Sequence, residues 1–228
     1  AVQTKIHAGP GAKVNLYVVQ LLDAGFECLF DIGAICEDEA EVTVMKLELG
    51  AGAVYAGGFA DLRGINSAFT ADIGYWGRNG QKLDMNYTVR HQGKKSQSRM
   101  DVKGILEDNA SKLFRGTIDF LSGCAGAKGG ETEDVLLLGE DAVNRTIPLI
   151  LCGEEDVEGN HGATIGRLDE RMLFYLASRG LPEIMALQLI ARARMEALCK
   201  KIPSQKVQAL VREKIGGAPE GGVGDEHQ

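Results

Sequence analysis

One histidine in this chain is surrounded by residue types that bind metal ions. His161 lies in the glycine-bounded stretch 159–162, for which we predict a tight turn. Imidazole, thiolate and carboxylate groups are ligands for iron and zinc. A solvated charged turn with a structural histidine would show the same composition, and spacing alone favours that reading over a metal site. The candidate ligands are His161, Cys152, Glu154, Glu155, Asp156 and Glu158.

The motifs of common catalytic machinery are absent from the sequence. Neither Gly-rich stretch, 9–14 or 159–164, has the Gly-Lys-Ser/Thr spacing of a phosphate-binding loop. There is no Gly-x-Ser-x-Gly elbow for a serine nucleophile. A second histidine, His91, lacks a cluster of candidate ligands, and we interpret it as structural. We therefore expect a non-catalytic chain that binds no nucleotide itself, so that any ATP dependence comes from a partner.

Composition excludes several classes of protein. The 228 residues are 44% hydrophobic and carry a net charge of -7, which indicates a globular protein and argues against nucleic-acid binding. No apolar run approaches the roughly 18 residues of a membrane span, and the N-terminal residues lack the pattern of a signal peptide. The five cysteines form no Cys-x-x-Cys pair. We expect reduced, mostly buried thiols and a cytoplasmic location.

Short apolar segments with alternating polarity run from about residue 14 to 151. Segments such as 41–49 and 114–120 are rich in β-branched and aromatic residues, which is typical of strands. A sandwich, a barrel or a solenoid fits many short strands. Asn79-Gly80 is the only Asn-Gly hairpin signal, and this scarcity favours a β-helix. We predict a mainly β protein with its β-helix core at residues 1–166.

The C-terminal part has the pattern of helices. Asp169 is a candidate N-cap, Gly180 a stop signal, and Pro182 suits the first turn of a second helix. We predict a helical partner-binding domain at 167–217 and a disordered, Gly-rich tail at 218–228. The helical hairpin caps an open end of the solenoid, which we take as the default, or docks a partner, and both can hold for different faces of the hairpin. One apolar stripe contains Ile184, Leu187, Ala191, Met195, Leu198 and Ile202.

These segments resemble the SufB/SufD family, the scaffold proteins of the SUF iron–sulfur cluster assembly system. The resemblance is most specific at His161–Gly166, Leu168–Glu170 and Phe174–Leu181, and weaker matches include Ser98-Arg99 and 114–118. The chain is similar to a reduced, SufD-like member. Two positions depart from the family: Asn160 precedes the histidine where SufD-like relatives often have Cys-Ser, and Leu176 replaces a cluster-related cysteine of SufB-like members.

The resemblance implies a fold, partners and a cargo. The fold is a right-handed parallel β-helix followed by a small α-helical domain. Two β-helices pair, as a homodimer or with a SufB-like protein, and an iron–sulfur cluster or iron is held transiently near His161. A SufC-like ABC ATPase binds the C-terminal helices. Alternatives are a module that recruits the ATPase without a cluster site and a β-helix carbohydrate-active enzyme. We expect contacts to the ATPase from Leu173, Phe174, Leu176, Arg179, Ile184 and Leu187.

Overall fold

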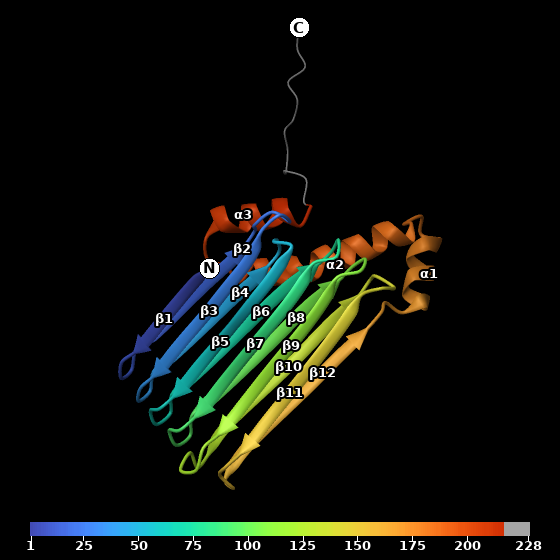
Figure 1. The fold of residues 1–228 in the computed structure, drawn as a ribbon. Coiled ribbons are helices and arrows are strands. Elements are labelled where there is room, and N and C mark those ends of the chain that lie inside the picture. The colour runs from blue at the N-terminus through green and yellow to red at the C-terminus, as the bar shows by residue number, and fades with distance from the viewer. Residues whose placement is uncertain (217–228) are drawn as a thin grey trace.

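The computed structural model, which describes residues 1–216, winds the chain into a parallel β-solenoid of about six turns (Figure 1). The mainly β, parallel β-helix prediction is confirmed. Each turn contributes one strand to each of two six-stranded sheets. Sheet A is formed by β1 (Val2–Ala8), β3 (Glu27–Cys36), β5 (Ala53–Leu62), β7 (Lys82–His91), β9 (Ser111–Phe120) and β11 (Val143–Cys152). Sheet B is formed by β2 (Lys13–Gln20), β4 (Glu41–Glu48), β6 (Ala68–Gly77), β8 (Gln97–Leu106), β10 (Ala127–Leu137) and β12 (Val157–Gly166).

The strands pair in parallel with the equivalent strand of the next turn. Val2 pairs with Phe30 on one side of the solenoid, and Lys13 pairs with Glu41 on the other, so the first turn takes 28 residues in both sheets (30 − 2 and 41 − 13). Parallel strands require such long crossovers, which explains why the sequence contains few hairpin signals. Strands β1, β3, β8 and β12 were not singled out as strands from the sequence pattern.

One corner of the solenoid repeats the same left-handed backbone conformation in successive turns. Positive φ angles occur at Gly11, Glu39, Asn66, Lys95 and Gly126, spaced by 28, 27, 29 and 31 residues. The backbone N–H groups of these residues donate to the next turn, for example Asn66 to the Lys94 carbonyl at 3.0 Å. The corner therefore continues the ladder of hydrogen bonds between turns, which satisfies backbone groups that a loop would leave to water.

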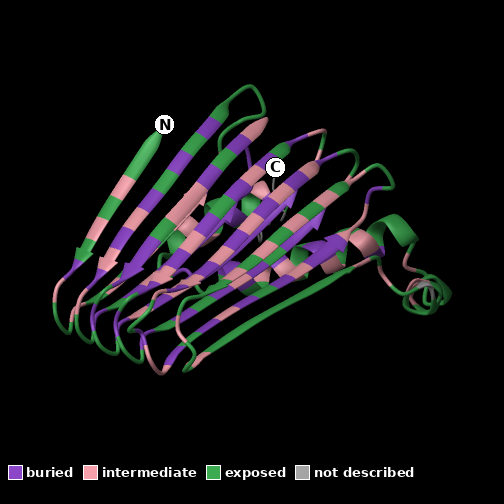
Figure 2. Cartoon of the chain, turned by 60° about the horizontal axis from the view of Figure 1, so that its bottom comes forward, coloured by how far each residue is buried: buried purple, intermediate pink, exposed green. Residues whose placement is uncertain are grey.

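Alternate side chains of each strand point between the two sheets and form the core. In β9 the buried and half-buried residues alternate along the strand, and Figure 2 shows the same banding on its neighbours. This core includes Phe30, Leu62, Met85, Phe114 and Phe120.

Three helices follow the solenoid: α1 (Glu170–Ser178), α2 (Glu183–Cys199) and α3 (Gln205–Lys214). Asp169 caps α1, accepting from the Arg171 N–H at 2.9 Å, and Gly180 has a φ of +84°, as predicted. Pro182 is the N-cap of α2 rather than a residue of its first turn.

The C-terminal half of α2 and helix α3 cover the outer face of sheet B, whereas α1 lies beyond the ends of the strands (Figure 1). The C-terminal half of α2 buries Ala191, Met195 and Leu198 against Leu47 and Trp76 of the sheet. The default expectation that the helical hairpin caps an end of the solenoid is therefore wrong. Ile184, placed on the same apolar stripe by the sequence, is 71% exposed because the N-terminal half of α2 extends past the sheet. The predicted disordered tail, 218–228, lies outside the described residues.

Candidate functional site at the open end of the solenoid

The last turn of the solenoid, β11 and β12, is open. Within residues 1–216, β11 pairs only with β9, and β12 pairs only with β10. Each strand therefore presents one row of unpaired backbone N–H and C=O groups, which makes it a template for another strand. The outer face of β11 also exposes aliphatic side chains, including Ile147 at 54% and Leu149 at 47%.

His161 lies in the middle of β12, and the predicted tight turn at 159–162 is wrong. Glycine is present there for another reason: a Cβ on Gly159 would lie 3.0 Å from Ile150 and 3.1 Å from Phe120. His161 pairs in register with Glu131 of β10, whose side chain faces the core, so His161 also faces inward. Within residues 1–216 no further turn covers it, and the imidazole is exposed.

The other predicted metal ligands are spread over the surface near this end. Glu154 accepts hydrogen bonds from the Gly123 and Glu155 N–H groups, and these bonds lower its pKa. Glu158 pairs with Lys128 at 2.9 Å, which lowers the Glu158 pKa. Cys152 is an exposed free thiol at the end of β11.

The structure does not gather the six candidate ligands. Glu155 and Asp156 lie in the loop between β11 and β12, where the Asp156 carbonyl accepts from the Gly126 N–H at 2.7 Å. Across residues 1–216, no three His, Cys, Asp or Glu side chains form a group suited to a metal ion. The metal site at His161 stays a prediction.

Buried charges lie directly behind the open end, and the sequence analysis missed them. Lys112 of β9 and Glu133 of β10 are fully buried and form an ion pair. Thr146 of β11 joins them, 3.0 Å from the Lys112 Nζ and 2.5 Å from Glu133 Oε2. The Tyr75 hydroxyl donates to Glu133 at 3.4 Å. Strand alternation alone could not reveal this cluster: it places Lys112 on the same side of β9 as Phe114 and Ile118, but it does not show which residues of other strands lie beside it.

Glu131 of β10 is a titratable group that pairs in register with His161 of β12. It is only 4% exposed, and burial followed by repulsion from Glu133 raises its pKa to about 7. Its carboxylate occupies the space left by Gly116, where a Cβ would lie 1.8 Å from Oε2. A glycine on the facing strand therefore makes room for this carboxyl group.

The surroundings of His91 confirm that it is a structural residue. It is fully buried, and its two ring nitrogens contact the hydroxyls of Ser96 at 2.8 Å and Ser98 at 2.9 Å. The ring stacks on Phe120 with 4.7 Å between centroids. Burial lowers its pKa to about 4, so the neutral form is held.

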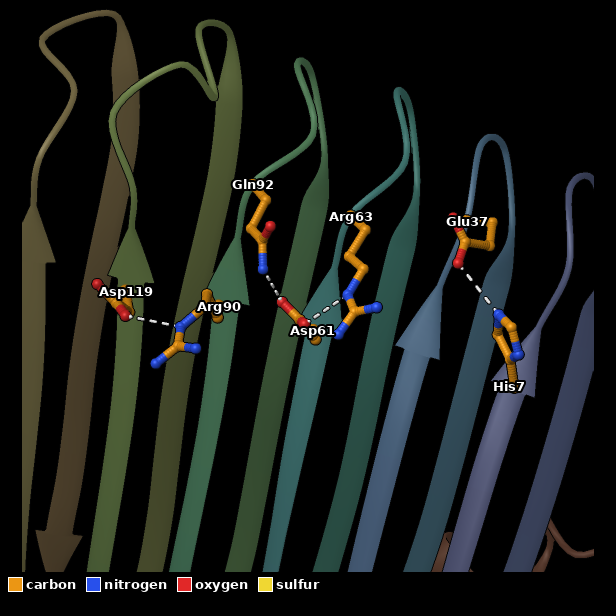
Figure 3. A network of polar contacts seen from close by, with 7 residues as sticks. All are labelled: His7, Glu37, Asp61, Arg63, Arg90, Gln92 and Asp119. Atoms are coloured by element: carbon orange, nitrogen blue, oxygen red, sulfur yellow. Dashed lines mark hydrogen bonds and ion pairs between the residues drawn. The ribbon is translucent and has the colours of Figure 1, made fainter.

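Polar side chains near the ends of the sheet A strands pair with each other (Figure 3). Asp61 accepts from Arg63 at 2.7 Å and from Gln92 at 2.5 Å. Arg90 pairs with Asp119 at 3.2 Å, and His7 contacts Glu37 at 3.0 Å. All of these contacts except Asp61–Arg63 join side chains of neighbouring turns, so we interpret this row as structural and do not place the candidate site there.

The predicted partner-binding residues divide into an exposed and a half-buried set. Phe174 is 76% exposed and Ile184 is 71% exposed, and Arg179 stacks over the exposed Tyr175 ring at 5.3 Å. Leu173, Leu176 and Leu187 are half-buried. Four further exposed apolar residues were not predicted, namely Met172, Tyr175, Met185 and Leu189.

The fold and the site together define a class: a parallel β-solenoid with an open, strand-edged end and an uncovered apolar helix surface. Residues 1–194 match the family model described as "SUF system FeS cluster assembly, SufBD core domain". The chain belongs to the SufBD family.

Curated relatives of this chain carry SufD and SufBD names. The chain is 31% identical over 132 residues to the iron–sulfur cluster assembly protein SufD of Bacillus subtilis, covering 58% of this chain and 30% of that protein. It is 32% identical over 126 residues to SufD of Escherichia coli, covering 55% and 30%. A chloroplastic SufBD family protein of Arabidopsis thaliana is 25% identical over 229 residues, covering 96% and 41%. The chain therefore spans less than half the length of these relatives.

None of the helices described here has the length and hydropathy needed to cross a membrane.

Proposed function

We propose that this chain is a non-catalytic scaffold in a SUF iron–sulfur cluster assembly complex. Membership of the SufBD family supports the assembly role. The observation that carries the scaffold role is the open end of the solenoid, where β11 and β12 have unpaired edges and β12 carries the inward-facing His161. The function needs pairing of two β-helices at this end.

Pairing at the open end is supported by its chemistry. Another pair of strands added to β11 and β12 would satisfy their free backbone groups and extend both sheets. The exposed aliphatic residues of β11 supply apolar area for the same contact. The second subunit is either a further copy of this chain or a SufB-like protein.

Iron or an iron–sulfur cluster is the cargo of this scaffold. The described residues of one copy do not supply three gathered ligands, so they do not fit a complete site. His161 is the group that we assign to contact the cargo, because it faces the open end and has room around it. Cys152 and the nearby carboxylates are secondary candidates.

A SufC-like ABC ATPase is the proposed partner of α1 and α2. The chain has no phosphate-binding loop of its own, and the two helices leave six large apolar residues exposed. Exposed apolar patches on one face indicate an interaction surface. The contact residues are then the exposed Phe174, Tyr175, Ile184, Met185 and Leu189, together with Met172.

The test is anaerobic reconstitution with the ATPase, the second subunit, ferrous iron and sulfide. We expect the His161→Ala variant to lose most of the cluster absorbance of the wild-type complex. His7→Ala is the matched control, since His7 is also exposed but pairs with Glu37 at the opposite end of the solenoid, far from β11 and β12. Equal cluster yield from wild type and His161→Ala would exclude the role of His161.

The same experiment separates the scaffold from a simple recruiting module. A complex that retains the ATPase but never develops iron–sulfur absorbance, with wild type or variants, would favour a module that recruits the ATPase without handling the cluster. The absent cluster-related cysteine at Leu176 is the observation behind that second candidate.

A further inference from the structure

A groove lies between the protruding half of α2 and two corners of the solenoid. It has a volume of about 550 Å³, and its apolar floor is formed by Leu138, Ile184 and Leu187. It continues onto the exposed residues Met185 and Leu189 of the same helix. The groove is therefore continuous with the exposed apolar surface of α2 that we propose as part of the ATPase contact.

The rim of this groove is acidic. Glu107, Asp108, Glu140 and Asp141 lie on the two corners that face α2. Glu140 and Asp141 are exposed, and within residues 1–216 they have no ion pair and no hydrogen bond to their side chains.

The other two rim carboxylates differ in their surroundings. The Asp108 side chain accepts from the Asn79 N–H at 3.0 Å and interacts electrostatically with Arg78. Burial raises the pKa of Glu107, and the nearby Arg78 opposes this shift. Glu107 and Asp108 therefore both lie near Arg78, whereas Glu140 and Asp141 line the groove without an ion pair among residues 1–216.

We infer that the groove receives a segment of the ATPase in which an apolar anchor is flanked by lysine or arginine side chains. This inference rests on the proposed function and adds the chemistry of the partner. The apolar floor accepts the anchor, and the rim matches the flanking cations. The same rim disfavours acidic surfaces, so it also selects against wrong partners.

The rim carboxylates should affect the association rate, and the apolar floor should affect the dissociation rate. Exposed carboxylates attract a basic segment over several ångströms, and this attraction falls with ionic strength. The apolar contact is little affected by salt. Rim substitutions should thus change the association rate and its salt dependence, and floor substitutions should change the dissociation rate.

The test measures binding of a purified SufC-like ATPase from the same organism to the full chain. We expect Glu140→Lys/Asp141→Lys to weaken binding about tenfold at about 0.05 M salt and much less at about 0.5 M salt. Glu140→Gln/Asp141→Asn should fall between this variant and wild type. The matched control is Glu27→Lys/Glu39→Lys, which reverses two exposed carboxylates at the other end of the solenoid. Both rim residues are exposed, so the variants retain the fold.

The outcomes separate the two proposals. Normal binding by the lysine variant, with an unchanged salt dependence, would overturn the acidic-rim inference while leaving the ATPase contact intact. An equal loss in the Glu27→Lys/Glu39→Lys control would overturn it too, because net charge alone would then explain the effect. If wild type itself fails to bind the ATPase, the proposed function is contradicted, and the inference fails with it.

Discussion

His91 and His161 both face inward on the solenoid, yet their surroundings differ completely. His91 lies between turns, where Ser96, Ser98 and Phe120 hold the neutral ring. His161 lies on the last turn, where one side of the core row is open. The same residue type is a structural element in a closed turn and an exposed side chain at the open end. The comparison shows that position along the solenoid, rather than residue type, decides which inward groups are available for chemistry.

The largest effect should come from breaking the buried ion pair behind the open end. Lys112→Met leaves Glu133 buried without its cation, and we expect a loss of about 3–5 kcal/mol of unfolding free energy at neutral pH. Urea denaturation followed by circular dichroism measures this. The double variant Lys112→Met/Glu133→Leu should recover most of the loss, since no charge then remains buried.

If Lys112→Met were as stable as wild type, the region behind the last turn would be open to solvent. The turn that contains β9 would then be open to water as the last turn is, although Lys112 is buried in the structure.

The pH dependence of stability should report the closed environment of His91. Its pKa is about 4 in the fold against 6.5 in an unfolded chain, so the unfolded state binds more protons between these values. Stability from this group is present above pH 6.5 and is lost as the pH falls toward 4, by about 3 kcal/mol. The measurement is the difference in unfolding free energy between wild type and His91→Gln over this range. A flat difference would show that His91 is not held neutral by burial.

Glu131 should give a pH dependence of opposite sign. Its pKa is raised to about 7, so the folded state binds the extra proton, and stability from this group is lost as the pH rises from about 4.5 through 7. We expect wild type to lose about 2 kcal/mol more than Glu131→Gln between pH 5 and 8, somewhat less than the full shift because the neighbouring open end admits water. Parallel pH profiles would place Glu131 in contact with solvent.

The smallest effect on stability should come from His161 itself. The exposed ring makes no hydrogen bond or ion pair among residues 1–216, so His161→Ala should change the unfolding free energy of the isolated chain by no more than about 0.5 kcal/mol. A loss of several kcal/mol would mean that His161, like His91, is a structural residue, and it would contradict the difference between the two histidines.

Much of the fold could be predicted because it depends on local patterns. The alternation in segments such as 41–49 indicated strands, and the scarcity of hairpin signals indicated a solenoid. Asp169 and Gly180 marked the ends of α1, since capping and positive φ have local chemical requirements. Strand β12 was missed because its glycines suggested a turn, whereas Gly159 is needed for close packing on Ile150 and Phe120.

The candidate site was only partly predictable. His161 could be selected from its sequence context, and its place on an open, inward-facing row agrees with that choice. Glu131, Glu133 and Lys112 could not be selected, because they are far apart in sequence from His161 and look like ordinary surface charges of strands. Burial between two sheets, which no local pattern specifies, makes them part of the same region.

The sequence by itself determined the class of the protein: the periodicity of its strands, the caps of its helices and the residues that carry the family resemblance. The tertiary structure decided that Lys112, Glu133 and Thr146 of three different strands lie together, and that Glu140 and Asp141 stay exposed on a corner of the solenoid. It also decided that α2 and α3 cover sheet B and leave the last turn open. The physical reason is that strand propensity acts between neighbours in sequence, whereas burial depends on residues about one solenoid turn away or farther.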